Sequence, residues 1–133
     1  MAQITRFEDI KAWQVARELT RLIYVLSNKG LFARDFGLRD QIRRAVVSIM
    51  SNIAEGFGRG GDKEFIQFLS TARGSVAEVK SQLYVALDLG YVAPVEFGQM
   101  YEMADMISRL IGGLIGYLQR NDYEFKGSKF KQS

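Results

Sequence analysis

Apolar residues recur at three- and four-residue steps in four stretches of this chain, and turn-forming residues separate the stretches. This spacing places the apolar side chains of each stretch on one side of an α-helix. Such a helix is stable in water only when its apolar side packs against another element, and short connections favour antiparallel neighbours. The pattern therefore predicts an all-α protein, an antiparallel up-down-up-down four-helix bundle.

Capping and turn residues predict where the four helices begin and end. The expected limits are a capping box at Thr5–Glu8 with a stop at Asn28–Gly30, Leu38 to Gly56, the N-cap Asp62 to Gly90, and Pro94 to Asn121. A loop containing Asp35 and Gly37 joins the first two helices. We expect one domain, residues 1–122, followed by a basic polar tail, residues 123–133.

The apolar and aromatic surface is larger than one small bundle needs. The aromatic residues concerned are Phe7, Trp13, Tyr24, Phe32, Phe36, Phe57, Phe68 and Tyr84. Surplus apolar surface of this kind commonly serves a subunit interface. The third helix also has small residues where a second backbone could approach, namely Ser70, Gly74, Ser75, Ala77 and Ser81. We expect a homo-oligomer, the alternative being that these small residues pack only within the bundle.

The chain contains no cysteine and no histidine. Disulfides, thiolate and imidazole metal sites, and the usual histidine base are therefore excluded. Helical spacing relates four polar residues: Ser48, Ser51, Asn52 and Glu55. A serine nucleophile needs a base, and none has a recognisable spacing here, so the four residues are expected to form a polar seam instead. Arg73 is expected to pair with a nearby carboxylate. We expect no catalytic residue, no metal and no cofactor.

No segment resembles a targeting or membrane sequence. The N-terminal residues lack a basic-then-apolar signal pattern, and no run approaches the roughly 18 to 20 apolar residues that a membrane span needs. A cytoplasmic protein without membrane contact is the expectation.

The formal net charge of +3 is unevenly distributed, and the half of the chain up to Gly60 is net positive. The candidate nucleic-acid-binding cations are Arg39, Arg43, Arg44, Arg59, Lys63, Lys126, Lys129 and Lys131. Two interpretations stay open: these residues are solvated helix faces, or they form a basic surface for RNA or DNA.

Gly56, Gly58 and Gly61 match the spacing G-x-G-x-x-G. A dinucleotide-binding fingerprint must follow a strand, whereas this one follows a predicted helix. The glycines are therefore expected to end the second helix and reverse the chain. Free amides at the start of the third helix, with Arg59 and Lys63 nearby, could still hold a phosphate.

The combined motifs resemble the 23S ribosomal RNA intervening-sequence protein family, also called S23 ribosomal proteins. The matching stretches are Phe7-Glu8-Asp9 with Trp13, Gly37-Leu38 with Gln41 and Arg43-Arg44-Ala45, Ser48-Ile49, Ser51 to Gly56, Glu64-Phe65, Phe68-Leu69, Ala72 to Ser75 with Glu78, Gln82-Leu83, and Leu87 to Tyr91. The signature residues are Ser48, Ser51, Asn52, Glu55, Gly56, Arg73 and Gly74. Met50 stands where relatives usually carry proline, so a straighter second helix is expected.

The resemblance implies a left-handed bundle that assembles as a homopentamer. Its shape is similar to that of the accessory variability determinant protein of diversity-generating retroelements, which binds nucleic acid and a reverse transcriptase. Some bacteria encode family members within inserts of ribosomal RNA genes. We therefore expect a non-enzymatic oligomeric adaptor that binds RNA or DNA phosphates, with a reverse-transcriptase-like protein as a partner by analogy. The alternative is a structural or protein-interaction module that binds no nucleic acid.

Overall fold

The computed structural model describes residues 4–128, with side chains as far as Arg120. The described chain forms, in order, η1 (Phe7–Asp9), α1 (Lys11–Leu26), α2 (Gly30–Arg34), α3 (Phe36–Gly58), α4 (Asp62–Asp88) and α5 (Pro94–Ser128). Every described element is helical, which confirms the predicted all-α class.

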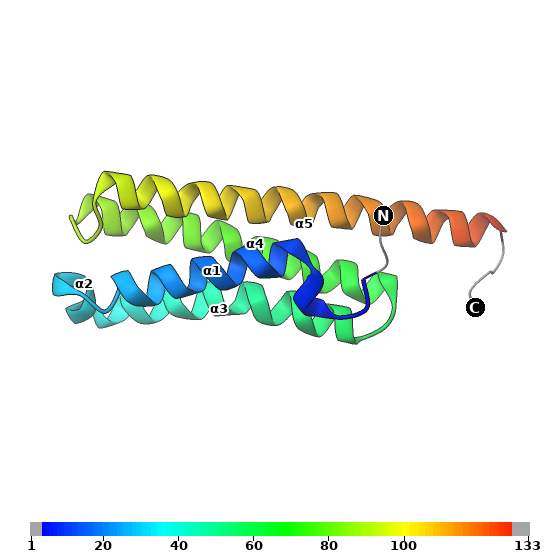
Figure 1. The fold of residues 1–133 in the computed structure, drawn as a ribbon, viewed down its shortest axis with the longest axis horizontal. Coiled ribbons are helices and arrows are strands. Elements are labelled where there is room, and N and C mark those ends of the chain that lie inside the picture. The colour runs from blue at the N-terminus through cyan, green and yellow to red at the C-terminus, as the bar shows by residue number, and fades with distance from the viewer. Residues whose placement is uncertain (1–3, 129–133) are drawn as a thin grey trace.

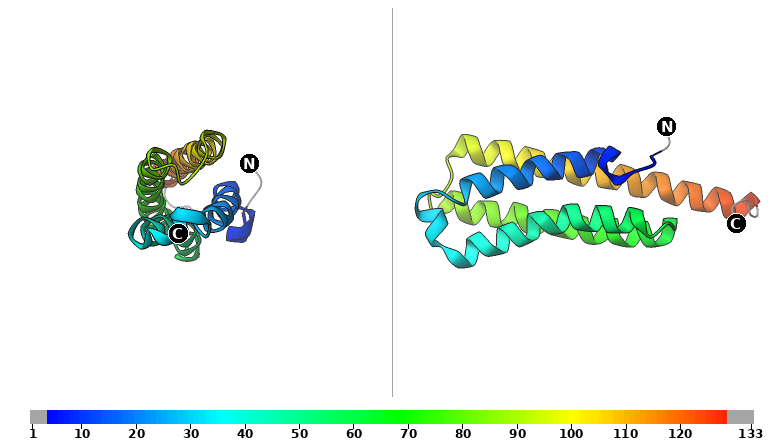
Figure 2. Two further views of the ribbon diagram at one scale, coloured as in Figure 1. Left: turned by 90° about the vertical axis from the view of Figure 1, so that its left-hand side faces the viewer. Right: turned by 60° about the horizontal axis from the view of Figure 1, so that its bottom comes forward.

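The four long helices lie side by side, and the chain reverses direction at each connection between them (Figure 1). α3 packs against α4, α4 packs against α5, and α1 contacts both α3 and α5. The end view in Figure 2 shows the helices arranged around a common centre. The C-terminal part of α5 projects beyond the other helices at the end where α3 connects to α4 (Figure 1).

The predicted apolar stripes form the core. Every residue of the stripe expected in the second helix, from Leu38 to Ile53, is buried, and so is the stripe from Phe65 to Ala86. Met100, Ala104 and Ile107 of α5 complete the centre, with exposed fractions of 1% or less. Burying one large aliphatic side chain stabilises the fold by roughly 1.5 to 3 kcal/mol, so this shared core holds the four helices together.

The start of the first helix and the following loop differ from prediction. The residues of the predicted capping box form η1 instead, and α1 begins at Lys11 without a side-chain cap. The predicted loop contains the short helix α2. Asp35 then caps α3, because its carboxylate accepts a hydrogen bond from the Leu38 amide at 3.1 Å.

Gly56 does not end its helix, because α3 continues to Gly58. Gly56 is buried, and a Cβ atom built there would lie 2.5 Å from the Cβ of Phe68, so the glycine allows α3 and α4 to approach closely. The chain reverses at Gly60, whose φ of 87° lies in the left-handed region that glycine tolerates.

Three further details complete the helix limits. The N-cap of α4 is Gly61, and Asp62 is the first helical residue rather than the cap. α3 passes Met50 without a break. The fourth long helix passes Asn121 and extends to Ser128. In the part of the chain that the structure describes, no helix is long and apolar enough to cross a membrane.

Candidate nucleic-acid interface

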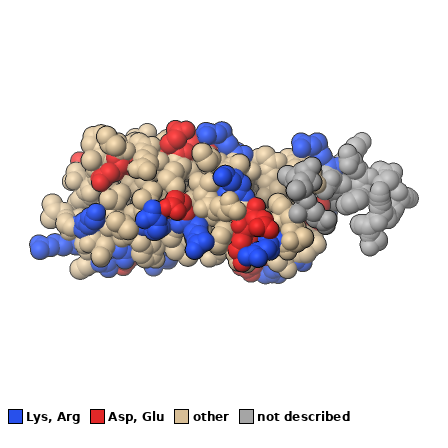
Figure 3. Space-filling view, in the orientation of Figure 1, with Lys and Arg blue, Asp and Glu red and all other residues tan. Residues whose placement is uncertain are grey.

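The N-terminal half of α3 lies beside α1 and carries three of the arginines predicted to bind nucleic acid. Figure 3 shows basic side chains along the lower part of the view, over α1 and α3, with acidic side chains between them. Arg39, Arg43 and Arg44 differ in what they contact, and these contacts decide which of them is available to a ligand.

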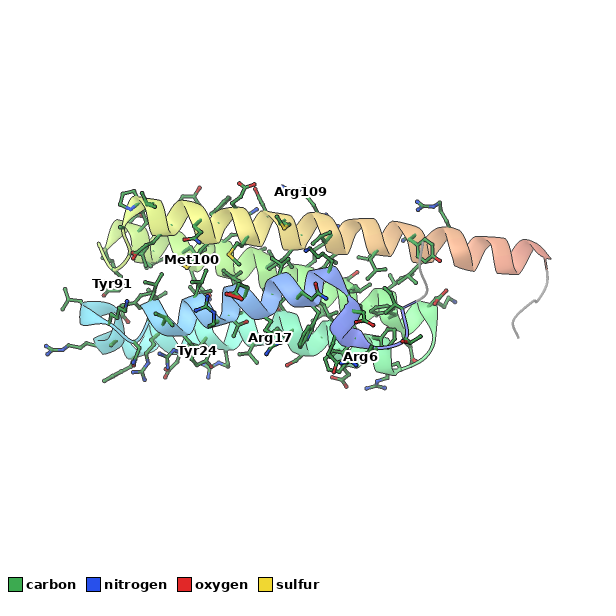
Figure 4. The ribbon with its side chains drawn as sticks, viewed as in Figure 1. Arg6, Arg17, Tyr24, Tyr91, Met100 and Arg109 are labelled. Atoms are coloured by element: carbon green, nitrogen blue, oxygen red, sulfur yellow. The ribbon has the colours of Figure 1, made fainter. Side chains whose placement is uncertain are left out.

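Arg43 is engaged within the protein. Its Nε donates a hydrogen bond to Ser27 Oγ at 2.8 Å, and Ser27 is fully buried at the end of α1. Its guanidinium also lies over the Tyr24 ring, 4.5 Å from the centroid. Tyr24 is 41% exposed and is labelled in Figure 4. Arg43 therefore ties α3 to α1 and keeps Tyr24 in place at the surface.

Arg39 is engaged in a similar way. It donates to the Ala33 carbonyl oxygen and to Asp40 Oδ1, both at 3.1 Å, and its guanidinium lies 4.8 Å from the centroid of the Phe36 ring. These contacts join α2 to the first turn of α3. Arg39 contributes positive charge to the surface, and two of its N–H donors are used by these contacts.

Arg44 is exposed and makes no ion pair or hydrogen bond to another residue of the described chain. Two open depressions meet at its side chain. One has a volume of about 350 Å³ and is lined by Tyr24, Asp40, Arg43, Arg44 and Val47. It combines two arginines and one aspartate with a partly exposed aromatic ring. Cations and aromatic rings contact the phosphates and the bases of single-stranded nucleic acid.

The second depression lies between α3 and α4 and has a volume of about 400 Å³. Its lining residues are Gln41, Arg44, Ala45, Ser48, Glu78 and Gln82. Gln82 Nε2 donates to Gln41 Oε1 at 3.5 Å, and the buried Gln82 Oε1 has no hydrogen-bond partner in the described structure. Glu78 is exposed and makes no ion pair with any described residue. The depression therefore places the Glu78 carboxylate and the unpaired Gln82 oxygen beside one cation, Arg44.

At the glycine-rich end of α3, Arg59 is paired within the protein. Arg59 Nη2 donates to Glu55 Oε2 at 2.9 Å, and the guanidinium lies 5.1 Å from the centroid of the Phe68 ring. Lys63 is exposed in the first turn of α4 and makes no ion pair with a described residue. The structure thus separates the predicted cations into two groups at opposite ends of α3.

The predicted polar seam is present in part. Ser48 Oγ and Ser75 Oγ lie 3.0 Å apart, joining α3 to α4. Asn52 Nδ2 donates to the Ser48 carbonyl oxygen at 2.8 Å and to Ser48 Oγ at 3.0 Å. Ser51 is exposed. These groups satisfy one another, which is the structural role expected for buried polar side chains between helices.

Arg73 forms no ion pair with a carboxylate among the described side chains, contrary to the prediction. Its Nε donates to Ser108 Oγ at 3.3 Å, and its guanidinium lies over Gly112, where an added Cβ would be 3.1 Å from Nη2. Arg73 therefore joins α4 to α5. Gly74 is exposed, and a Cβ added there would meet no atom within 4 Å.

The side chains of the three C-terminal lysines predicted to bind nucleic acid lie outside the described part of the structure. Lys126 lies within α5, but its side chain falls outside the described part of the structure, and Lys129 and Lys131 lie outside the described residues. Among the described residues, no group of three or more carboxylates could hold a metal ion.

Comparisons with known proteins place this arrangement in a family. Residues 8–113 match the family model for the 23S rRNA-intervening sequence protein. The chain belongs to this family. The match covers α1, α3, α4, the first part of α5 and both depressions, so the residues around Arg44 lie in the part of the chain that the 23S rRNA-intervening sequence proteins share.

A solved structure has the same fold. It is the crystal structure of a protein of unknown function from the S23 ribosomal protein family of Bacteroides thetaiotaomicron. The TM-score is 0.72 at 20% sequence identity, and the alignment covers 79% of this chain and 95% of that chain. At this identity the likeness shows the fold alone. No curated protein matches the chain.

Three residues at the site of this family member are not among the residues that the sequence predicts to bind a ligand. Tyr24 was expected only as surplus aromatic surface, and Gln41 and Gln82 only as motif residues. The i, i+4 spacing of Glu78 and Gln82 puts both side chains on one face of a helix, and this is the sequence pattern that indicates they lie together. Their meeting with Gln41 across the helix pair depends on how α3 and α4 pack.

Proposed function

We propose that this member of the 23S rRNA-intervening sequence protein family is a non-enzymatic, oligomeric nucleic-acid-binding protein, and that the surface between α1 and α3 around Arg44 contacts the strand. The observation that carries the proposal is that Arg44 makes no hydrogen bond or ion pair with a described residue and stands beside the Arg43–Tyr24 pair. A free guanidinium contacts phosphate, and the exposed part of the Tyr24 ring offers a stacking surface.

The proposed assembly is a homopentamer, as the family resemblance implies, and its proposed location is the cytoplasm. Exposed apolar residues support self-association: Leu31, Phe36, Leu89 and Val95 are 54 to 82% exposed. They lie near the end of the bundle that holds α2 and the α4–α5 connection. Surfaces of this composition are typical of subunit interfaces. A reverse-transcriptase-like protein is a proposed further partner, by analogy with the accessory variability determinant protein.

A second candidate is a structural or protein-interaction module without nucleic-acid binding. The observation in its favour is that intramolecular contacts use side-chain donors of Arg39, Arg43 and Arg59. The two candidates differ over Arg44, which contacts a phosphate in the first and no nucleic acid in the second.

Fluorescence anisotropy with labelled single-stranded and double-stranded RNA and DNA tests the proposal. Binding should weaken steeply with salt, because each neutralised phosphate releases counterions. Arg44→Glu should weaken binding by at least about tenfold at low salt, in line with the loss of a phosphate contact and added repulsion. Arg109→Glu is the matched control, because Arg109 is an arginine of α5 whose side chain is 62% exposed.

Two results would count against the proposal. A folded protein that binds no strand at low salt would support the protein-interaction module instead. Light scattering after size-exclusion chromatography reports the subunit number, and a monomer at micromolar concentration would contradict the proposed oligomer.

A further inference from the structure

The depression between α3 and α4 contains a carboxylate and an amide oxygen that have no partner in the described structure. Glu78 and Gln82 line it from α4, and Gln41 and Ser48 line it from α3. The Glu78 carboxylate has no ion-pair partner within the described structure, and Gln82 Oε1 is a buried acceptor without a donor. A buried acceptor left unpaired destabilises the fold, and a ligand can donate to this oxygen once the Gln82 side-chain amide turns toward the depression.

The same depression has one cation, Arg44, at the border with the basic depression near Tyr24. A matching ligand therefore carries negative charge at one end and adjacent N–H donors on a compact planar group at the other. The volume of about 400 Å³ falls within the range of small-molecule sites, roughly 300 to 1,000 Å³.

A guanine nucleotide meets these conditions. Guanine presents the N1–H and the N2 amino group side by side, and a carboxylate accepts both in the way it accepts two N–H groups of arginine. The neighbouring O6 is an acceptor for an amide N–H of Gln41 or Gln82. In a duplex this edge of the base is occupied by pairing, so only an unpaired base offers it.

We infer that the α3–α4 depression of this protein binds an unpaired guanine of a single strand whose adjacent phosphate contacts Arg44. The inference rests on the proposed nucleic-acid-binding function and names its preferred ligand. Glu78 reads the N1–H and N2 amino groups, Gln82 supplies the unpaired acceptor and an amide donor, and Arg44 fixes the phosphate between the two depressions.

The test compares three fluorescein-labelled ten-nucleotide RNAs: oligouridine, the same strand with one central guanosine, and the same strand with one central inosine, which lacks the N2 amino group. Anisotropy at fixed low salt should show the guanosine strand binding about tenfold more tightly than oligouridine, as expected of one bidentate base contact. The inosine strand should fall between them. A single guanosine also avoids four-stranded structures that longer guanine runs form.

Two variants locate the preference. Glu78→Gln should reduce the preference for guanosine to within about twofold while oligouridine affinity is kept, because the carboxylate is the proposed reader of the base. Glu102→Gln is the control, since this carboxylate on α5 is 70% exposed at its side chain and lies on a helix that does not line the depression. In the wild-type protein, guanosine monophosphate should also shift the Gln82 side-chain amide signals in ¹H–¹⁵N spectra.

The outcomes are distinguishable. If no strand binds, the proposed nucleic-acid function fails. If the strands bind with equal affinity, or if Glu78→Gln keeps the preference, nucleic-acid binding stands and the guanine site is overturned. Arginine presents similar paired donors, so N-acetyl-arginine amide is tested as a competitor. Displacement by this compound but not by guanosine monophosphate assigns the depression to a protein partner and also overturns the inference.

Discussion

The two ends of α3 carry the same kinds of residue but leave their cations in different states. At the glycine-rich end, Arg59 is held by Glu55 one helical turn earlier and by the ring of Phe68. Near the opposite end, Arg43 takes the aromatic and hydroxyl contacts, and its neighbour Arg44 has no partner in the described chain. Two adjacent arginines on a helix point in different directions, so one of them can serve structure while the other stays available to a ligand.

The largest expected effect concerns packing at the glycine-rich end. Gly56→Ala would place a Cβ 2.5 Å from the Phe68 Cβ, and both atoms belong to rigid parts of their helices. We expect a loss of about 2 kcal/mol in the free energy of unfolding, measured by urea or guanidinium denaturation. Gly58→Ala is the control, because a Cβ there meets no atom within 4 Å and the change should cost nothing or stabilise by up to about 1 kcal/mol. Equal effects at both positions would show that close packing is not the reason for Gly56.

The second effect compares the free and the paired arginine directly. Arg44→Ala should weaken binding of a single-stranded RNA about tenfold at low salt and lower the slope of log affinity against log salt by about one. Arg59→Ala should change the affinity less than twofold, because its charge is already paired with Glu55. Anisotropy titrations at several salt concentrations measure both. A larger effect at Arg59 would move the interface to the glycine-rich end.

The third effect separates the adjacent arginines by stability. Arg43→Ala removes the donor to buried Ser27 and the contact with Tyr24, and should cost about 1 kcal/mol in the free energy of unfolding, since the side chain is partly exposed. Arg44→Ala should stay within about 0.5 kcal/mol of the wild type. Chemical denaturation measures both variants. If Arg44→Ala destabilised the fold as much as Arg43→Ala, its side chain would have a structural role.

The bundle could be predicted from the sequence because burial follows helical spacing. Ile42, Val46 and Ile49 repeat at three- and four-residue steps, and all three have an exposed fraction of 0%. The ends of the helices are harder to predict from the sequence. Gly56 is a residue type that commonly ends helices, but here it allows α3 to pack closely against Phe68 of the next helix. No local sequence pattern contains that contact.

The site could be predicted only in part, for a related reason. The arginines were recognisable by type, but their availability depends on partners distant in sequence: Ser27 lies 16 residues before Arg43. Gln41 and Gln82 are 41 residues apart and meet only through the packing of α3 on α4. Residue type therefore predicts which groups could bind a ligand, while packing decides which of them remain unpaired.

The smallest expected effect is a pH dependence confined to the start of α3. Tyr91, labelled in Figure 4, donates a hydrogen bond from its hydroxyl to Asp35 Oδ2 at 2.9 Å, and the other oxygen of Asp35 caps α3. This hydrogen bond, with burial and the negative charge of Asp35, raises the pKa of Tyr91 above its ordinary value. The folded state thus holds the phenolic proton more tightly than the unfolded state does. The contribution to stability is complete below the ordinary pKa of about 10 and is lost as pH rises through the raised value.

Denaturation of the wild type and Tyr91→Phe at several pH values between 8 and about 11 isolates this contribution, since the other ionisable groups are common to both proteins. The wild type should lose its advantage over the variant as the solution becomes alkaline. A difference that stays constant over this range would mean that the Tyr91 hydroxyl does not support the Asp35 cap. In that case the start of α3 would be held by the Leu38 amide contact and by the stacking of Phe32 on the Tyr91 ring, whose centroids lie 5.3 Å apart.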